Sequence, residues 1–338
     1  MDRIISKELI IIGSGPAGLK AAQEASEKGI DYVVLERGEI AQAWREIRPE
    51  MVMLSPRHPQ RDWTSLSYKF PIWKLPVRRP YCTAKEFVNY LDEFADHFKL
   101  HIKTGHLVKE VTREESGFEV TCANGLSYRA PLLLIATGIL SNPYIPDLPG
   151  TDQNPFVMHS HKYQGKEPFT QKKVLIVGAG NSAAETAIDL CGYAMVYLVS
   201  RADLKFFSDT KKLYHIRGVS ESYLKELISM ELIRYRAYQE IQKIEENTVY
   251  FKDWKLTVDK IIFATGYRAY IPALKNMNIR MNKHGYPEVV QTGESIQYSN
   301  LFFAGPLSFQ TTVSIVVHGF LRSISDTVQR IAEKLREQ

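Results

Sequence analysis

Cysteine is scarce in this sequence, long apolar runs are missing, and no block of one charge occurs. The three cysteines, Cys82, Cys122 and Cys191, lie far apart and form no Cys-x-x-Cys pair. No disulfide framework and no metal site is therefore expected, and a reducing cytoplasm fits best. No stretch approaches the roughly 18 apolar residues of a membrane span, and no signal peptide is expected. The basic residues, with a net charge of +5, are scattered among acidic ones, so we expect no nucleic-acid partner.

What the sequence does contain is enough chain for two domains and a βαβ pattern near its start. Its 338 residues exceed one typical hydrophobic core. Residues 9–12 form a short apolar run before Gly13, a helical pattern continues to Gly29, and residues 31–36 supply a second apolar run. This order predicts two parallel strands joined by a right-handed helical crossover.

The same order of elements returns in the second half of the chain. The apolar run 174–177 leads into Gly178, residues 182–190 have a helical pattern, and residues 196–199 form another apolar run. Two such units predict an α/β protein with two Rossmann-like dinucleotide-binding domains.

Proline-rich residues 142–150 separate the two units, because proline fixes φ and removes a backbone donor. A second crossing is expected near residues 268–272. We assign residues 1–146 and 288–338 to the first domain and residues 147–287 to a second domain inserted into it.

The end of the chain is expected to return to the first domain. Residues 301–304 form an apolar run before Gly305, which predicts a buried strand. Residues 315–335 have the periodicity of a closing helix.

The first glycine turn has the fingerprint of a dinucleotide site. Its residues of interest are Gly13, Gly15, Pro16, Ala17 and Gly18. The first glycine permits a tight turn, the second lets the backbone approach a pyrophosphate, and the third lets helix and strand pack closely. Glu36 ends the next strand, where its carboxylate would accept hydrogen bonds from ribose hydroxyls and repel a 2′-phosphate.

The second glycine turn differs at the residue that reads the ribose. Its residues of interest are Gly178, Gly180, Asn181, Ser182 and Ala183. Arg201 follows Gly178 by 23 residues, the offset at which Glu36 follows Gly13. A guanidinium suits a 2′-phosphate, Ser200 adds a hydroxyl and Lys205 a further cation, so this unit is predicted to bind NADPH rather than NADH. A solvated charge at a strand end is the alternative for Arg201.

Two Ala-Thr-Gly segments extend the pattern, each after an apolar run. They are Ala136, Thr137 and Gly138, and Ala264, Thr265 and Gly266. With two fingerprints in this order, the chain resembles the two-dinucleotide-binding-domain flavoproteins. The resemblance implies FAD in the first domain, NADPH in the inserted domain, and hydride transfer between them. It also assigns five further residues to the FAD site: Arg37, Trp44, Val108, Gly305 and Pro306.

Within that group, Trp44 and residues 54–56, 142–146 and 159–163 are most similar to flavin-containing monooxygenases. The chain departs from them in its short length and in lacking Phe-x-Gly before residues 159–163. This resemblance implies a monooxygenase acting on a small nucleophilic or carbonyl substrate, with no catalytic side chain assigned. His159 and His161 are candidates for the domain junction.

Two other functions stay open at this point. The chain also resembles bacillithiol disulfide reductases, which implies an NADPH-dependent reductase of a small disulfide or other acceptor. Ala17 stands where those proteins carry their reactive cysteine, which would leave Cys82. The third alternative is a flavin-binding redox sensor with little turnover. Residues 310–312 are candidates to face the flavin ring, and a homo-oligomer is left open.

Overall fold

The computed structural model describes residues 4–212, 214–309 and 316–337. The chain divides into two compact units. Unit 1 comprises residues 1–142 and 268–338, and unit 2 comprises residues 143–267. Residues 268–287, which the sequence suggested for the inserted domain, lie in unit 1 because η5 (Pro272–Met277) packs into its core.

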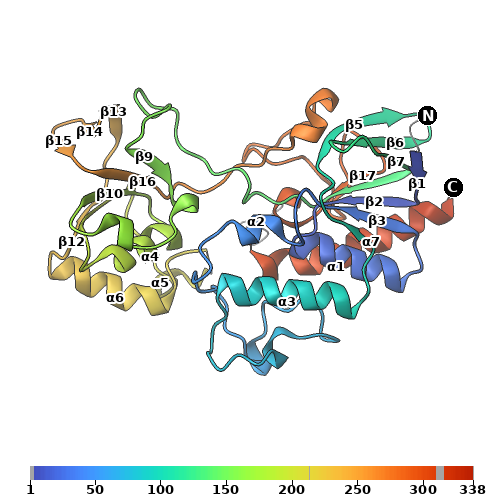
Figure 1. Cartoon of the computed structure of the whole chain (residues 1–338), viewed down its shortest axis with the longest axis horizontal. Helices are drawn as coiled ribbons and strands as arrows, with labels where there is room; N and C mark the ends of the chain where they lie inside the picture. Colours follow the sequence, from blue (N-terminus) through green and yellow to red (C-terminus); the bar gives the residue numbers. More distant parts are fainter. Residues whose placement is uncertain (1–3, 213, 310–315, 338) are drawn as a thin grey trace. The chain divides into compact units, whose positions relative to one another are not determined.

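The centre of unit 1 is a parallel sheet in the order β17-β8-β2-β3-β4 (Figure 1). Its strands are β2 (Leu9–Ile12), β3 (Tyr32–Leu35), β4 (Ile102–Lys103), β8 (Leu132–Ile135) and β17 (Leu301–Phe303). β2, β3, β8 and β17 are buried along their whole length, which is why these strands read as continuous apolar runs. The predicted βαβ unit and the return of residues 301–304 are therefore confirmed.

Helices cover one face of this sheet and a second sheet covers the other. α1 (Pro16–Glu27) and α7 (Val317–Glu337) lie side by side and pack against β2, β3 and β8 (Figure 1). The second sheet has the order β1-β7-β6-β5. Its strands are β1 (Ile4–Ser6), β5 (Val108–Glu114), β6 (Gly117–Cys122) and β7 (Ser127–Ala130). The predicted closing helix is confirmed from Val317 onward.

The long connection after β3 folds around an aromatic cluster beside α1. α3 (Ala84–His97) begins at Thr83, whose side chain and that of Glu86 form a capping box. Phe87, Tyr90 and Phe94 of this helix are fully buried. The short helices of unit 1 are α2 (Gln42–Arg45), η1 (Pro59–Arg61), η2 (Ile72–Lys74) and η6 (Gly305–Ser308).

Unit 2 repeats this three-layer plan. Its parallel sheet has the order β12-β11-β10-β16-β9. The strands are β9 (Val157–His159), β10 (Lys173–Val177), β11 (Met195–Val199), β12 (Ile233–Arg236) and β16 (Lys260–Phe263). The helical side consists of η3 (Ser160–Lys162), η4 (Glu167–Phe169), α4 (Asn181–Leu190), α5 (Phe207–Thr210) and α6 (Gly218–Ser229).

The other face of the unit 2 sheet is covered by an antiparallel ribbon. It consists of β13 (Ile241–Glu245), β14 (Thr248–Phe251) and β15 (Lys255–Thr257). The predicted α/β class with two Rossmann-like units is therefore confirmed.

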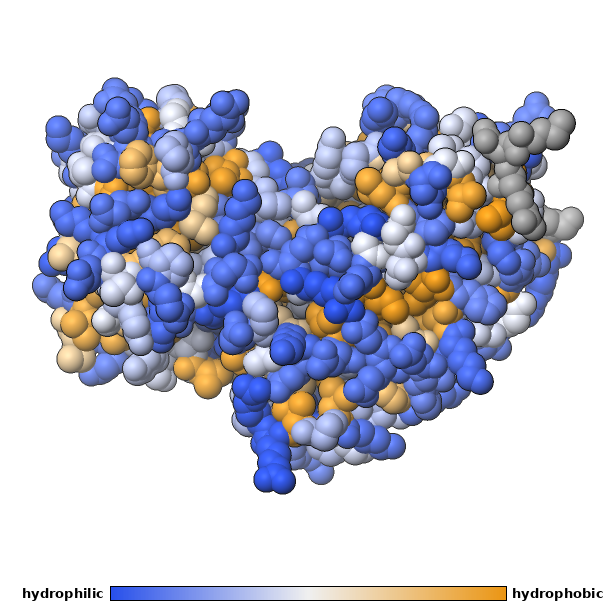
Figure 2. Space-filling view, in the orientation of Figure 1, coloured by the Kyte–Doolittle hydropathy of each residue, from blue (hydrophilic) through white to orange (hydrophobic). Residues whose placement is uncertain are grey.

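Hydrophilic side chains cover most of the face shown in Figure 2, and hydrophobic ones gather in smaller groups between them. Within the described part of the chain, no helix is both long enough and apolar enough to cross a membrane.

Candidate dinucleotide sites

The first glycine turn has the geometry that its sequence predicts. Gly13 has φ +101°, and a Cβ there would lie 2.7 Å from the carbonyl oxygen of Ala136. A Cβ on Gly18 would overlap the carbonyl oxygen of Gly13. A Cβ on Gly15 would instead have no atom within 4 Å. Two of the glycines are thus required by close packing inside the protein, whereas Gly15 faces open space.

The N-terminus of α1 opens at the same place. Gly15 is its N-cap, and no side chain caps the first turn. Pro16 occupies the first helical position and Ala17 is buried. Backbone N–H groups and the helix dipole therefore present a site for an anion such as a pyrophosphate.

Glu36 is held against this turn rather than projecting into solvent. Its Oε2 accepts hydrogen bonds from the Ser14 amide at 2.9 Å and from Ser14 Oγ at 2.8 Å, and Oε1 accepts from the Gly38 amide at 3.2 Å. The residue is 5% exposed. Ser14 was not singled out from the sequence. Ser14 orients the Glu36 carboxylate, whose remaining lone pairs can accept hydrogen bonds from ribose hydroxyls.

The Ala-Thr-Gly segment of unit 1 lies beside the glycine turn. The Ala136 amide donates to the Ile12 carbonyl at 2.8 Å, and Gly138 has φ +67°. Among the described residues, the buried hydroxyl of Thr137 has no hydrogen-bond partner. An orphaned buried hydroxyl is costly in a bare protein, so this position fits a bound polar group.

The last strand of the sheet reaches the same turn. Gly305 has φ +69°, and a Cβ there would lie 2.9 Å from the Ala17 side chain. Pro306 follows in η6, where Ser308 Oγ donates to the Gly305 carbonyl at 2.9 Å. Three segments therefore meet at the carboxyl ends of the unit 1 strands: the first fingerprint, residues 136–138 and residues 305–306.

Three of the other predicted FAD residues have side chains engaged within the protein. Arg37 pairs with Glu46 at 2.6 Å. The Trp44 ring packs edge-on against Phe87 with centroids 4.8 Å apart. The Val108 side chain lies in the core between the two sheets of unit 1. The candidate residues 310–312 lie outside the described residues.

The second glycine turn repeats this design in unit 2. A Cβ on Gly178, whose φ is +155°, would overlap the Ala264 carbonyl oxygen, whereas one on Gly180 would have no atom within 4 Å. No side chain caps the start of α4. Ala183 is buried at the third position of the fingerprint, and Ser182 is exposed.

Asn181, in the same fingerprint, has its carboxamide turned toward the protein. Its Nδ2 donates to the carbonyls of Tyr214 at 3.4 Å and His215 at 2.8 Å, and its Oδ1 accepts from the Arg217 amide at 3.0 Å. The place of Asn181 in the fingerprint predicts a cofactor contact, which its backbone at the uncapped start of α4 remains in position to make. Its side chain fastens a distant segment to the start of α4.

The residues predicted to read the 2′-phosphate follow β11. Arg201 and Lys205 are exposed. Ser200 is buried, and its hydroxyl donates to the Ala202 carbonyl at 2.6 Å and lies 2.9 Å from the Tyr235 hydroxyl. Because that proton is used inside the protein, the two exposed cations are better placed than Ser200 to meet a phosphate.

The second Ala-Thr-Gly segment is hydrogen-bonded to Tyr144 and to His159, the last residue of β9. Thr265 Oγ1 donates to the Tyr144 carbonyl, and the Tyr144 amide donates to the Gly266 carbonyl at 2.9 Å. Ala264 is buried beside Gly178, and its amide donates to the Val177 carbonyl. Gly266 has φ +82° and its carbonyl also meets His159 Nε2 at 2.9 Å.

His159 is a buried, neutral histidine rather than an exposed one. Its Nδ1 accepts from the His161 amide at 3.0 Å, so Nε2 carries the proton that is donated to Gly266. Burial lowers the pKa of His159 from 6.5 to about 4, and the nearby His161 contributes to the same direction. The ring stacks edge-on against Tyr267 at 5.2 Å. These contacts indicate a structural role.

Acid is expected to destabilise the fold through His159. In the unfolded state the His159 ring takes up a proton near pH 6.5, whereas in the folded state it is protonated only near pH 4. Stability from the neutral ring is therefore complete above pH 6.5 and is lost as the pH falls toward 4. The urea midpoint of His159→Asn should change less between pH 7 and 5 than that of the wild type or of a control, His284→Asn, at an exposed site. Equal slopes in all three proteins would refute this role.

The three thiols are all held in their protonated form. Burial raises the pKa of Cys82 to about 11, and it raises the pKa of Cys122 to about 11 as well. Burial also raises the pKa of Cys191. A nucleophilic cysteine needs the opposite shift, toward a thiolate at neutral pH. The described residues contain no group of histidine, cysteine and carboxylate side chains suited to a metal ion.

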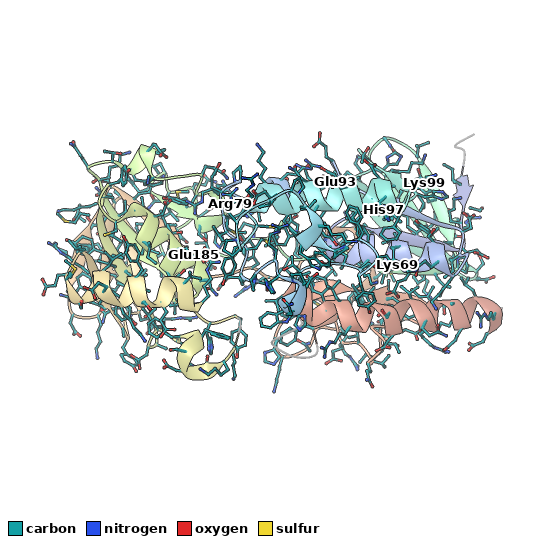
Figure 3. All side chains as sticks on the ribbon, turned by 90° about the horizontal axis from the view of Figure 1, so that it is seen from below. Lys69, Arg79, Glu93, His97, Lys99 and Glu185 are labelled. Carbon is teal, nitrogen blue, oxygen red and sulfur yellow. The ribbon has the colours of Figure 1, made fainter. Side chains whose placement is uncertain are left out.

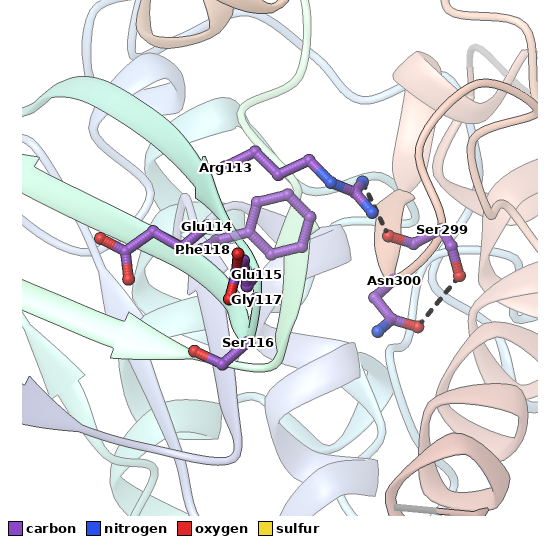
Figure 4. A pocket seen from close by; sticks show the side chains of 8 residues that line it. All are labelled: Arg113, Glu114, Glu115, Ser116, Gly117, Phe118, Ser299 and Asn300. Carbon is purple, nitrogen blue, oxygen red and sulfur yellow. Dashed lines mark hydrogen bonds between the residues drawn. The ribbon is translucent and has the colours of Figure 1, made fainter.

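A separate pocket of about 350 Å³ lies at the tip of the β5–β6 hairpin in unit 1 (Figure 4). Arg113 reaches across it to the Ser299 carbonyl at 3.3 Å, and Asn300 forms the opposite wall. None of the predicted site residues lines it.

These observations define a class: a protein built from two dinucleotide-binding folds, each with a glycine turn open at its second glycine. A family model described as pyridine nucleotide-disulphide oxidoreductase matches residues 10–305. The chain therefore belongs to the pyridine nucleotide-disulphide oxidoreductase family. It is a flavin-dependent enzyme with FAD and NADPH as its cofactors, as the family resemblance implied.

The chain is similar to a curated monooxygenase, and its fold is similar to solved structures of both a monooxygenase and a disulfide reductase. Indole-3-pyruvate monooxygenase YUCCA4 from Oryza sativa is 27% identical, over 82% of this chain and 78% of that protein. The structure of bacillithiol disulfide reductase from Staphylococcus aureus has a TM-score of 0.85 at 24% identity, covering 98% of this chain and 99% of that one. A flavin-containing monooxygenase from Stenotrophomonas maltophilia also gives 0.85, at 20% identity, covering 98% and 100%. The shared fold does not distinguish the two activities.

Proposed function

We propose that the chain is an NADPH-dependent flavin monooxygenase that oxygenates a small nucleophilic or carbonyl substrate. One observation carries this choice over a disulfide reductase: Ala17 occupies the fingerprint position where bacillithiol disulfide reductases carry their reactive cysteine. Burial, which raises the pKa of all three thiols, agrees with it. The likeness to an indole-3-pyruvate monooxygenase, whose named substrate is a carbonyl compound, supports it.

Unit 1 is proposed to hold FAD. The open side of Gly15 and the uncapped start of α1 would receive the pyrophosphate, and Glu36 would accept hydrogen bonds from the ribose. The orphaned Thr137 hydroxyl is the group that would gain a partner on binding. The backbone would approach FAD closely at Gly138, Gly305 and Pro306, because glycine has no side chain and the proline ring is compact.

Unit 2 is proposed to hold NADPH in the equivalent way. The open side of Gly180 would receive its pyrophosphate, and Arg201 and Lys205 would meet the 2′-phosphate. When bound, the two cofactors supply the hydride transfer and the activation of O2. The protein contributes binding, orientation and electrostatic complementarity.

The proposed reaction uses NADPH, a proton, O2 and the substrate. One oxygen atom enters the substrate and the other leaves as water, while NADPH is oxidised to NADP+. A disulfide reductase would instead consume NADPH and a proton to release two thiols without O2. Oxygen dependence therefore separates the two functions.

The deciding experiment measures NADPH oxidation with and without O2, using the purified FAD-loaded protein and a panel of small thioethers, amines and carbonyl compounds. A monooxygenase should transfer label from ¹⁸O2 to a member of the panel. Anaerobic NADPH oxidation that depends on an added low-molecular-weight disulfide would overturn the proposal.

Removal of the thiols should leave this activity in place. Cys82→Ala and, as a matched control, Cys122→Ala each remove a buried thiol that is protonated at neutral pH. Both are expected to keep the oxygen-dependent rate within about twofold, since a protonated thiol is a poor nucleophile. A Cys82→Ala protein with normal FAD content and no activity, beside an active control, would contradict the proposal.

A further inference from the structure

The segment between β11 and α6 carries several basic residues and is hydrogen-bonded to the second fingerprint through Asn181. Lys205, Lys211, Lys212, His215 and Arg217 lie on it, shortly after Arg201. Its two ends are joined, because the Ile216 amide donates to the Lys205 carbonyl at 3.0 Å and the Phe207 amide donates to the Ile216 carbonyl at 2.8 Å. Ile216 is fully buried in the unit 2 core. The segment is therefore a folded loop rather than a solvated charge run.

α4 holds this loop at two points one helical turn apart. Asn181 makes three hydrogen bonds to the backbone of residues 214, 215 and 217. Glu185, on the side of α4 shown in Figure 3, pairs with the Arg217 guanidinium at 3.0 Å. Asn181 is the residue after Gly180, so the loop is fixed directly beside the open part of the glycine turn.

His215 is oriented by its own short chain of hydrogen bonds. Its Nδ1 lies 2.6 Å from Thr210 Oγ1, and that hydroxyl donates its proton to the Phe206 carbonyl at 2.8 Å. Nδ1 must therefore donate to Thr210, which leaves Nε2 as the nitrogen that can take up a further proton. Protonation of His215 thus requires no rearrangement of the loop.

The charges around His215 favour an anionic ligand. Partial burial and the positive charges of Lys205 and Lys212 lower the pKa of His215 below 6.5. The carboxylate of Glu185 on α4 pairs with Arg217, and that of Glu221 on α6 pairs with Lys225 and accepts from Ser208. On the loop, Asp209 accepts from the Ser208 hydroxyl, and the Tyr214 ring lies 4.4 Å from the imidazole. A phosphate would offset the positive charges of Lys205 and Lys212 and so favour protonation of His215.

We propose that Asn181 is a positioning residue for the NADPH site, and that His215, held by it beside Lys205, is a further determinant of 2′-phosphate recognition. This rests on the proposed binding of NADPH in unit 2. Asn181 fixes the backbone of the loop, and His215 adds a positive charge that Arg201 alone does not supply. Neither residue is assigned a part in hydride transfer.

The proposal has a pH signature that a purely structural loop would not produce. A bound 2′-phosphate stabilises the imidazolium, so His215 takes up a proton when NADP+ binds. NADP+ affinity should therefore rise as the pH falls from 8 toward about 6.5, while NAD+ affinity should stay level. The range ends there because phosphate monoesters begin to protonate near pH 6.

The test is isothermal titration of FAD-loaded protein with NADP+ and with NAD+ at pH 8 and pH 6.5, in two buffers of different ionisation heat. Wild type should show proton uptake with NADP+ only. His215→Gln should lose that uptake and bind NADP+ roughly fivefold more weakly at pH 6.5. His284→Gln, at an exposed site in unit 1, is the matched control and should behave as wild type.

Asn181→Ala should weaken NADP+ more than NAD+ and lose the pH dependence, whereas Asn181→Asp, which keeps the acceptor for the Arg217 amide, should be affected less. If Asn181→Ala does not fold, the half-exposed His215 still carries the test. Unchanged proton uptake in His215→Gln, or equal losses for NADP+ and NAD+, would overturn the inference. A wild type that binds neither nucleotide would refute the proposed NADPH site itself.

Discussion

Gly15→Ala is expected to give a folded protein that no longer retains FAD. The added Cβ has no protein atom within 4 Å, and the φ of −70° at this residue suits alanine, so the fold should be unaffected. The same methyl group would occupy the space through which the backbone approaches the pyrophosphate. Loss of two hydrogen bonds to a charged phosphate, at roughly 1.5–3 kcal/mol each, corresponds to FAD binding weakened on the order of 100-fold or more.

Two other glycines provide the controls for this prediction. Gly180→Ala places a Cβ in equivalent open space in unit 2, and it should lose NADPH while the protein stays yellow. Gly18→Ala would overlap the Gly13 carbonyl and should fail to fold. The measurements are flavin absorbance of the purified protein, circular dichroism and thermal melting. A folded Gly15→Ala protein with full FAD content would contradict the assignment of unit 1.

The parts of the fold that the sequence predicted depend on neighbours along the chain. Strand, glycine turn and helix follow one another within a few residues. The positive φ of Gly13 and Gly178 is therefore consistent with residue type alone, since glycine adopts it without strain. The buried strands read as apolar runs because both faces of each parallel sheet are covered. Such local signals were enough for the α/β class, both turns and the closing helix.

Other features required contacts between residues far apart in sequence. A crossing near residues 268–272 was expected, and the chain does return to unit 1 at residue 268. The assignment of residues 268–287 to the inserted domain was wrong, because η5 packs against β5, a contact that no local pattern encodes. Ser14 and Asn181 sit inside the fingerprints, yet their partners Glu36 and residues 214–217 lie more than 20 positions away. Ser200 is predicted as a phosphate donor from its place before Arg201. Its burial and its hydrogen bond to the Ala202 carbonyl could not be read from residue type.

Arg201→Ala is expected to weaken NADPH binding without a comparable effect on NADH. The guanidinium is exposed, and among the described residues no carboxylate pairs with it, so its removal should leave the fold intact. A charge-assisted contact with the 2′-phosphate, at roughly 1.5–3 kcal/mol, corresponds to a loss of about 10- to 150-fold in NADPH affinity. NADH lacks that phosphate and should bind as before.

The matched control is Arg234→Ala, which removes the same charge from another exposed arginine of unit 2, one that stacks on Tyr197. If the effect of Arg201 came only from net charge, both variants would weaken NADPH alike, and both losses would fade with added salt. A direct contact predicts a loss confined to Arg201→Ala, together with a NADPH to NADH preference that falls in steady-state and binding measurements. Equal losses of NADPH and NADH in Arg201→Ala would show that Arg201 supports the fold or the pyrophosphate. The contrast with Glu36, at the same offset in unit 1, would then no longer explain which unit takes which cofactor.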